Sequence, residues 1–585
     1  MRTWQVLWQL IRYRPGLFLV NSFALTLFIV SLQVPGLVTR ETFNELTGDA
    51  TAGFTFWTLM AFLAASGLAR MISFYLMVSS QISFRFTTAA LLQKNILARI
   101  LQRPGASAMT QSPGEAISRF RGDVQQLCEF PLWMNQLIGL GIFVIIALVV
   151  MARIDPLITV FVFVPLLLVV FGVRAATHQI EKYRKAAREA TGNVTNFIGE
   201  IFGAVQAIQA NTAEEDVVNR FRKLNDTRRD ASLMDRLFIE MLHSVFRNAI
   251  SLGTGLTLIL AGRAMQDGTF TVGDFSLFVF YLHFVAEFTA VIGFLMGRYR
   301  QMGISVDRTT ELLQGAPAEA MVQHGPVYEK GSLPEVPFIP KADSDRLERL
   351  EAIGLTFRYP ESDKGIEGID LRLERGSFTV ITGRIGSGKT TLLRALLGLV
   401  ASDGGEARWN DEPIADAASF LVPPRCAYTP QAPRLFSDSL RNNILFGLPE
   451  EEIDVEDAVR LAVMEKDLEE MELGLDTTVG AKGVKLSGGQ IQRAAAARMF
   501  VRDSELLVFD DLSSALDLDT ERALWERLFE RKEATCLVVS HRHIALSRAD
   551  HIIVMKDGRV EAEGDLESLL DDCDEMKKLW KGEVV

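Results

Sequence analysis

Hydrophobic residues follow two contrasting patterns along the 585 residues of the chain. Up to about residue 300, long apolar runs with few charges alternate with charged segments of helical composition. After that point, short apolar strands alternate with helical segments and Gly-rich turns, which is typical of a soluble α/β domain. Because the chain is too long for one ordinary domain, the pattern predicts a membrane half followed by a soluble half.

Six apolar stretches in the first half are long enough to cross a bilayer. They lie near residues 17–38, 54–76, 134–152, 156–173, 241–262 and 275–296. Lys and Arg gather before the first stretch and in two long connections, roughly 77–133 and 174–240, whereas the alternate loops hold only Arg40, Arg153 and Arg263. Positive charge stays on the inner side. The chain is therefore predicted to be a multi-pass protein of the plasma (inner) membrane, with its amino terminus and its second half in the cytoplasm.

An amphipathic helix is expected at the amino terminus. Trp4, Leu7, Trp8 and Ile11 recur at helical spacing before the break at Pro15-Gly16, which predicts a helix lying in the inner interface of the membrane. The alternative is a frayed terminus.

Glu287 is the most informative charge within a predicted span. It lies near the middle of the sixth stretch, with His283 one helical turn earlier. An ionised carboxylate facing lipid costs several kcal/mol, so Glu287 should face the helical bundle or a watery cavity. In one interpretation Glu287 lines the transport path. In the other it makes a structural hydrogen bond to a neighbouring helix. Arg70 and Arg247 are weaker candidates, because side chains near the inner ends of spans can reach the headgroups.

Composition excludes several classes of protein. The net charge of −12 argues against a nucleic-acid partner, which would need a basic face. The four cysteines (Cys128, Cys426, Cys536 and Cys573) show no metal-binding spacing and are interpreted as free thiols. No cleavable signal peptide is evident.

A Gly-rich loop carries the chemistry of the second half. Gly383-Arg384-Ile385-Gly386-Ser387-Gly388-Lys389-Thr390 follows the apolar strand at 378–381 and opens a helix at Thr391. Glycines allow backbone N–H groups to approach phosphates closely, and the helix N-terminus adds a positive dipole end. Lys389 is expected to reach the β- and γ-phosphates of ATP, and Thr390 to bind Mg²⁺.

Two later segments suit the same nucleotide. Asp510 ends the apolar strand at 506–509, where a carboxylate beside the phosphate loop can hold Mg²⁺ partly through water; the alternative is an Asp in a surface turn. Leu486-Ser487-Gly488-Gly489-Gln490 precedes a helix, with Ser487 as N-cap and two glycines exposing N–H groups. This pentapeptide predicts a second anion site, although an ordinary capped helix has the same features.

In this order, the motifs resemble those of ATP-binding cassette (ABC) exporters, and the resemblance covers essentially the whole chain. More positions match residue by residue. Tyr359 resembles the aromatic residue that stacks on adenine, and Gln431 resembles the glutamine that senses Mg²⁺ and the membrane domain. Ser514-Ala515-Leu516-Asp517 resembles the loop that crosses the dimer interface, and His541 resembles the switch histidine on the γ-phosphate.

The resemblance implies a fold class and a partner. The expected fold is an α-helical six-span transmembrane domain at 1–310, a linker rich in Pro and Gly at 311–345, and an α/β P-loop nucleotide-binding domain with a helical subdomain at 346–585. In the family, the signature loop of one subunit completes the ATP site of the other. The chain should therefore pair with a second half-transporter. The inner connections should carry short coupling helices, near Pro104–Pro113 and Ala210–Val217, that rest on the nucleotide domains.

Two positions depart from the family pattern. The residue after Asp510 is normally Glu, which orients and deprotonates the attacking water, but here it is Asp511. Losing one methylene retracts the carboxylate by ~1.5 Å. A displacement near 1 Å can cost roughly 10²-fold in rate. Ala481-Lys482 stands where the family usually has Glu-Arg, so coupling to the membrane domain is expected to differ.

These observations predict an ATP-driven exporter that uses ATP and Mg²⁺ and acts in the lipid bilayer on a drug, lipid or peptide. A slow site at Asp511 beside an intact signature loop favours a heterodimer, with a homodimer of two slow sites as the alternative. A second functional class is an ATP-gated regulatory or channel-like membrane protein with little turnover.

Overall fold

The computed structural model of the chain describes residues 2–49, 53–102, 105, 113–329, 331–334, 336–360, 362, 364–480, 485–530 and 534–583. At 113, 162–178, 180–181, 242–243, 246–247, 249–250 and 514 it describes the backbone alone. The chain divides into two compact units, the first made largely of residues up to 330 and the second largely of the residues that follow.

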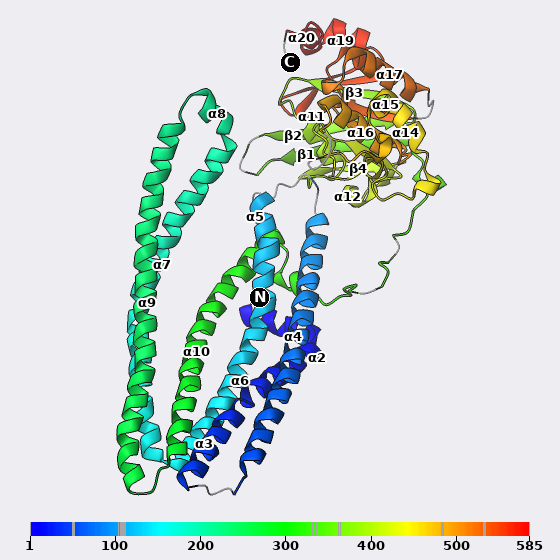
Figure 1. Ribbon diagram of the computed structural model, residues 1–585. Helices are drawn as coiled ribbons and strands as arrows, with labels where there is room; N and C mark the ends of the chain where they lie inside the picture. The colour runs from blue at the N-terminus through cyan, green and yellow to red at the C-terminus, as the bar shows by residue number, and fades with distance from the viewer. Residues whose placement is uncertain are drawn as a thin grey trace. The chain divides into compact units, whose positions relative to one another are not determined.

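The described residues of the first unit form helices and the turns between them (Figure 1). The helices are α1 Thr3–Tyr13, α2 Pro15–Val30, α3 Gln33–Thr47, α4 Phe56–Leu101, α5 Pro113–Ser118, the π-helix η1 Arg119–Asp123, α6 Val124–Ile154, α7 Pro156–Gly203, α8 Val205–Ala210, α9 Glu214–Gln266, α10 Val272–Leu312 and the 3-10 helix η2 Ala318–Val322.

Four described helical segments are long and apolar enough to cross a membrane: Pro15–Thr47, Phe56–Leu101, Gly114–Ile154 and Val272–Leu312. They contain the first, second, third and sixth predicted spans. The fourth and fifth predicted spans fall in α7 and α9, where many side chains lie outside the described residues. At 1.5 Å per residue, the 46 residues of α4 extend roughly 70 Å, more than twice the thickness of a bilayer core.

The predicted amino-terminal helix is present as α1, and α2 begins at Pro15 as expected from the break there. Leu7 of α1 is buried, whereas Trp4 and Trp8 are exposed. Of the two predicted coupling segments, the one near Pro104–Pro113 lies almost entirely outside the described residues. At the other, α8 ends at Ala210 and α9 begins at Glu214, so a short helix precedes the predicted position at the turn between the two long helices (Figure 1).

Buried hydrogen bonds join the spanning helices within this unit. Asn135 of α6 donates to Asn21 of α2 at 2.9 Å. Gln33 of α3 donates to the backbone carbonyl of Phe143 at 3.0 Å and accepts from the hydroxyl of Tyr281. A polar group left unpaired in an apolar interior is costly, so these pairs fix which helices are neighbours.

The second unit contains two sheets (Figure 1). The four-stranded antiparallel sheet has the order β2-β1-β4-β5, and the six-stranded sheet has the order β10-β9-β3-β8-β7-β6. The strands are β1 Arg349–Arg358, β2 Gly365–Glu374, β3 Phe378–Gly383, β4 Gly404–Trp409, β5 Glu412–Pro413, β6 Cys426–Thr429, β7 Leu506–Asp510, β8 Thr535–Val539, β9 His551–Lys556 and β10 Arg559–Gly564.

Helices cover this pair of sheets. They are η3 Asp343–Asp345, α11 Lys389–Leu396, α12 Ala417–Phe420, α13 Leu440–Leu445, η4 Glu450–Glu452, α14 Val455–Leu461, α15 Glu465–Glu470, η5 Gly474–Asp476, α16 Gly488–Phe500, η6 Leu512–Ala515, α17 Leu518–Phe529, α18 His543–Leu546, α19 Leu566–Asp572 and α20 Asp574–Trp580. The helices α13 to α16 separate β6 from β7 in the sequence and form the predicted helical subdomain.

The site owes its position to the central strands. β3, β7 and β8 run parallel, and every residue of these three strands is buried. Because the carboxyl ends of parallel strands meet at one edge of the sheet, the phosphate loop after β3 and the acidic pair at the end of β7 come together there. The four cysteines are free, as predicted, and all four are buried.

Candidate functional site

The phosphate loop turns tightly between β3 and α11. Gly386 and Gly388 have φ angles of 83° and 101°, a backbone region that other residues rarely adopt. A Cβ atom built on Gly386 would meet no other atom within 4 Å, so this side of the loop is open. A Cβ on Gly383 would instead collide with the backbone carbonyl of Met555. The glycines thus give the loop an open face on one side and close packing on the other.

Lys389 folds back onto this loop. Its ammonium group donates to the carbonyls of Gly383 and Arg384 at 2.7 and 2.8 Å. Burial lowers the pKa of Lys389, partly opposed by the nearby carboxylates of Asp511 and Asp510. The Ser387 hydroxyl is buried, and the described residues offer it no hydrogen-bond partner. A partly desolvated cation and an unpaired hydroxyl in an open glycine loop fit a bound phosphate chain.

Asp510 and Thr390 are brought together as the sequence suggested. The Thr390 hydroxyl donates to Asp510 Oδ1 at 2.9 Å, and the Tyr428 hydroxyl approaches Oδ2 at 3.3 Å. Asp510 is only 1 % exposed, and burial raises the pKa of its carboxyl group. An adjacent hydroxyl and a buried carboxylate are hard oxygen donors of the kind that Mg²⁺ prefers.

Described residues form no group of three or more His, Cys, Asp or Glu that could hold a metal ion by themselves. Mg²⁺ usually takes one or two protein oxygens and completes its shell with phosphate and water. The donor set at Thr390 and Asp510 therefore fits a magnesium ion that arrives with a nucleotide.

Asp511 lies in a left-handed backbone conformation with φ 54° and ψ 43°. The Gln431 side chain donates to Asp511 Oδ2 at 3.2 Å. Burial raises the pKa of Asp511, and the nearby His541, the hydrogen bond from Gln431 and the Lys389 ammonium group partly oppose this effect. Asp511 therefore interacts with two other predicted site residues, Gln431 and His541.

Tyr359 reaches the first turn of α11. Its hydroxyl lies 3.3 Å from the Thr391 hydroxyl, and its ring packs edge-on against Phe357. Tyr359 is half-buried, and the contact with Thr391 places it beside the helix that follows the phosphate loop.

The signature pentapeptide caps α16. The Ser487 hydroxyl accepts from the Gln490 backbone N–H at 3.2 Å, and the Gln490 side chain accepts from the Ser487 N–H at 2.9 Å. A Cβ on Gly489 would lie 2.9 Å from the Ala515 carbonyl. The Ala515 N–H in turn donates to Gln492 at 3.2 Å. The signature helix and the segment after Asp511 thus pack directly together. Ala481-Lys482 lies outside the described residues.

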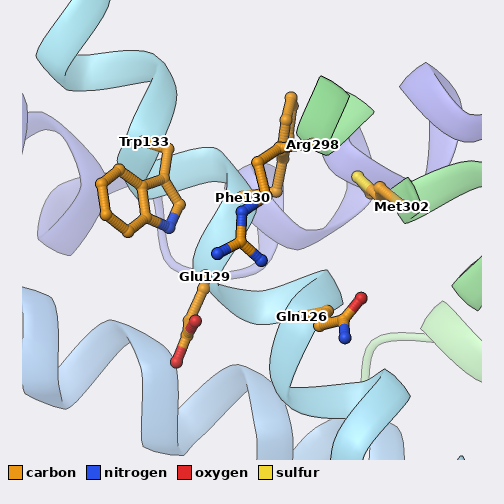
Figure 2. A pocket seen from close by; sticks show the side chains of 6 residues that line it. All are labelled: Gln126, Glu129, Phe130, Trp133, Arg298 and Met302. Atoms are coloured by element: carbon orange, nitrogen blue, oxygen red, sulfur yellow. The ribbon is translucent and has the colours of Figure 1, made fainter. Parts of the chain in front are cut away.

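A recess in the first unit is lined by side chains of α6 and α10 (Figure 2): Gln126, Glu129, Phe130, Trp133, Arg298 and Met302. The guanidinium of Arg298 lies 5.1 Å from the ring centroid of Phe294, and Trp133 packs edge-on against that ring. Glu129 lies 3.4 Å from Arg85. The recess therefore combines aromatic surface with groups of both charges.

Glu287 and His283 are both exposed and lie one turn apart on α10. Within its own chain, Glu287 therefore does not face the interior of the helical bundle. Arg70 lies over the ring of Phe28 at 5.1 Å, and the side chain of Arg247 lies outside the described residues.

Two family models match this chain. The model for the ABC transporter transmembrane region matches residues 21–287, and the model for the ABC transporter nucleotide domain matches residues 366–514. The chain belongs to the ABC transporter family. Its fold matches a solved bacterial Atm1-family ABC exporter with ATP bound, with a TM-score of 0.76, 19% identity, and coverage of 98% of this chain and 99% of that one. The predicted fold class and half-transporter architecture are confirmed.

The names of related transporters point to different kinds of cargo. The chain is 28% identical to an ATP-dependent lipid A-core flippase of Chromohalobacter salexigens, over 81% of this chain and 79% of the relative. It is 27% identical to antigen peptide transporter 2 of Homo sapiens, over 77% of this chain and 63% of the relative. This ABC transporter is thus an integral, multi-pass membrane protein of a family whose members dimerise and couple ATP hydrolysis to transport.

Sequence reasoning missed several contacts around the ATP site of this ABC transporter. Arg384 of the phosphate loop pairs with Glu575 of α20, and His543 stacks on Trp580. Tyr428 approaches Asp510. The motif around Tyr428 indicated only Gln431 as functional, and no local spacing links Arg384 to a residue 191 positions away.

Proposed function

We propose that this chain is one half of an ATP-driven exporter that moves a drug-like molecule, a lipid or a peptide across the plasma (inner) membrane. The observation that carries the proposal is the union, in one chain, of membrane-crossing helices with a domain that has both a phosphate loop and a signature helix. The two named relatives point to a lipid and to a peptide respectively, so all three cargo classes enter the test.

In this proposal the ATP site works through a small set of side chains. Lys389 leaves the carbonyls of its own loop and binds the β- and γ-phosphates, while Tyr359 stacks on the adenine. Thr390, Asp510 and Gln431 would hold Mg²⁺, and the bound ion would supply positive charge to the phosphates. Asp511 faces the attacking water and His541 the γ-phosphate; Ser487, Gly488, Gly489 and Gln490 serve the ATP of the partner subunit.

Hydrolysis at the site built on this phosphate loop is proposed to be slow. The carboxylate of Asp511 ends one methylene short of the position that Glu reaches, and a shift near 1 Å can cost roughly 10²-fold. The signature helix is well formed, so the partner's site can turn over. This asymmetry supports a heterodimer of two unlike halves, with the nucleotide domains in the cytoplasm, where the long Arg-rich connections of the membrane domain also lie.

Cargo is proposed to travel along the exposed face of α10. An exposed carboxylate in the middle of a span is unfavourable in lipid, but it is stable against water or a polar partner. Glu287 and His283 therefore suit a cavity shared with the second half-transporter, and the recess with Arg298 lies on the same helix.

The test is transport in proteoliposomes. The chain is purified alone and together with a candidate partner half-transporter, and ATP-dependent uptake of a cationic dye, a fluorescent lipid and a labelled peptide is measured together with ATP hydrolysis. One of the three should accumulate and stimulate hydrolysis, and Ser487→Arg should abolish both effects. If ATP binds but none of the three accumulates or stimulates hydrolysis, export is contradicted and an ATP-gated role is favoured.

A further inference from the structure

The helix α20 touches the phosphate loop through a buried carboxylate. Both nitrogens of the Arg384 fork, Nε and Nη2, donate to the two oxygens of Glu575, the second at 2.8 Å. Glu575 is only 4 % exposed, whereas the Arg384 side chain is partly exposed. A bidentate pair of this kind fixes orientation as well as distance, so it holds the loop at a set angle to α20.

The same helix touches the segment that follows the switch histidine. The His543 ring stacks on Trp580 with centroids 4.0 Å apart and an interplanar angle of 14°. His543 Nε2 also lies 2.9 Å from the Trp580 carbonyl. His543 begins α18, two residues after His541. One seven-residue helix is therefore tied both to the phosphate loop and to the segment that follows His541.

The body of α20 cannot shift easily between these contacts. Met576 is fully buried and Leu579 nearly so, in the same core cluster as Leu546 of α18 and Val554 of β9. Close-packed interiors transmit displacement instead of absorbing it. A movement of Arg384 should therefore reach His543 through the helix.

Phosphate binding requires the loop to change at the point that α20 holds. The carbonyls of Gly383 and Arg384 now accept from Lys389, which has to turn toward the phosphates when ATP binds. The Arg384 carbonyl and the Arg384 guanidinium belong to one residue. The ion pair with Glu575 therefore fixes the position of the loop from which Lys389 moves when it exchanges the two carbonyls for phosphates. Arg384 is directed at Glu575 and acts through the backbone; it is a positioning residue.

We propose that α20 positions the ATP site, with Glu575 holding the phosphate loop through Arg384 and Trp580 holding the switch segment through His543. The helix thereby raises the affinity for Mg²⁺-ATP and links the state of the two loops. This inference rests on the proposed binding of ATP at the phosphate loop.

The test uses the full-length chain in detergent, with the dissociation constant of Mg²⁺-ATP measured by displacement of a fluorescent ATP analogue. Glu575→Gln keeps the shape and one acceptor but removes the charge, and it should weaken binding about five- to tenfold. A double-mutant cycle with Arg384→Gln isolates the pair, and the losses should be far from additive. Trp580→Leu should weaken binding as well, because it releases the switch segment.

Asp345→Asn is the matched control, since Asp345 is also a buried acid paired with a partly exposed arginine, Arg425, at 2.8 Å. It should leave the dissociation constant unchanged even if it lowers the unfolding temperature. The inference is overturned if Glu575→Gln binds Mg²⁺-ATP like the wild type, if the cycle is additive, or if the control loses as much affinity. A wild-type chain that fails to bind Mg²⁺-ATP would instead contradict the proposed function.

Discussion

At the residue scale, the proposed slow turnover depends on the single methylene group by which Asp511 is shorter than Glu. Its left-handed backbone is one that Asp tolerates better than most residues, and its N–H donates to the Val539 carbonyl at 3.1 Å. Since the backbone is held there, the reach of the carboxylate depends on side-chain length alone. The Gln431 amide already engages it at 3.2 Å, and this contact draws one oxygen toward the loop.

Changing Asp511 tests this explanation. Asp511→Glu should raise steady-state ATP hydrolysis of the heterodimer severalfold at most, because the same composite site also needs the partner's signature loop. Asp511→Ala should change the overall rate by less than about twofold, since a carboxylate displaced by ~1 Å contributes little. Phosphate release from the purified complex measures both variants. Loss of all turnover in Asp511→Ala would make Asp511 a working base and remove the main argument for a heterodimer.

The sequence predicted contacts at this site wherever a ligand imposes local geometry. Thr390 and Asp510 were expected to share one ion and do lie in hydrogen-bond contact. The ion pair of Arg384 with Glu575 could not be foreseen, because it depends on how a distant helix packs onto the sheet. A sequence motif indicates which residues contact a ligand. The contacts between a motif and the rest of the domain become visible only in the folded structure.

At the scale of elements, the signature helix α16 illustrates what local patterns can and cannot give. The N-cap at Ser487 was readable from the sequence, and its reciprocal bond with Gln490 is present. The contact between this helix and α15 could not be predicted from the sequence. Arg493 and Gln490 both donate to the Asp467 carboxylate, at 2.6 and 3.0 Å, and the side chains of Arg493 and Asp467 are largely buried.

Element boundaries were also less predictable than element types. Apolar length marked the spans, but the helices run on far past them, as α4 does to Leu101. The turn between α8 and α9 falls at Asn211 and Thr212. Thr212 has a φ of 49°, a conformation that a β-branched side chain disfavours, so the sequence did not predict a turn at this residue.

Removing the carboxylate of Asp467 should weaken the helical subdomain. Asp467→Asn leaves the largely buried guanidinium of Arg493 without its counter-charge, which is expected to cost about 2–3 kcal/mol. Thermal unfolding followed by circular dichroism measures the loss. Glu530→Gln removes a comparable charge from the exposed pair with Arg460 and should leave the midpoint unchanged. Equal shifts in the two variants would show that burial of the pair does not matter.

At the scale of the whole molecule, we propose that one chain supplies a phosphate loop to one ATP and a signature helix to another. The two contributions are predicted to be unequal, because the site of the phosphate loop is proposed to be slow and the signature is proposed to serve the faster one. Two variants on one chain can therefore report on two different sites.

Ser487→Arg should abolish turnover of the complex, because it introduces bulk and charge where the partner's γ-phosphate has to dock. Lys389→Ala should cost less, because it damages the slow site. ATP hydrolysis and nucleotide binding of the purified heterodimer separate the two effects. Equal losses in hydrolysis would argue for two equivalent sites and hence for a homodimer.

In the membrane domain, the path of the cargo is tested most directly at Glu287. This carboxylate is exposed in the middle of α10, with His283 on the same face, so something polar must cover it in the assembled transporter. Glu287→Gln keeps the shape of the side chain and removes its charge. If this face lines the transport path, the variant should fold normally but change cargo selectivity, with the largest loss for cationic cargo.

The measurement is uptake of cationic, neutral and anionic probes into proteoliposomes over a range of pH, with unfolding temperature as a check on folding. Glu45→Gln is the matched control, because Glu45 is an exposed acid near the end of α3 that lies beyond the apolar core of its span. It should leave the selectivity profile unaltered. A Glu287→Gln transporter whose uptake of every probe equals that of the wild type would assign this carboxylate to the contact between the two halves instead of to the path of the cargo.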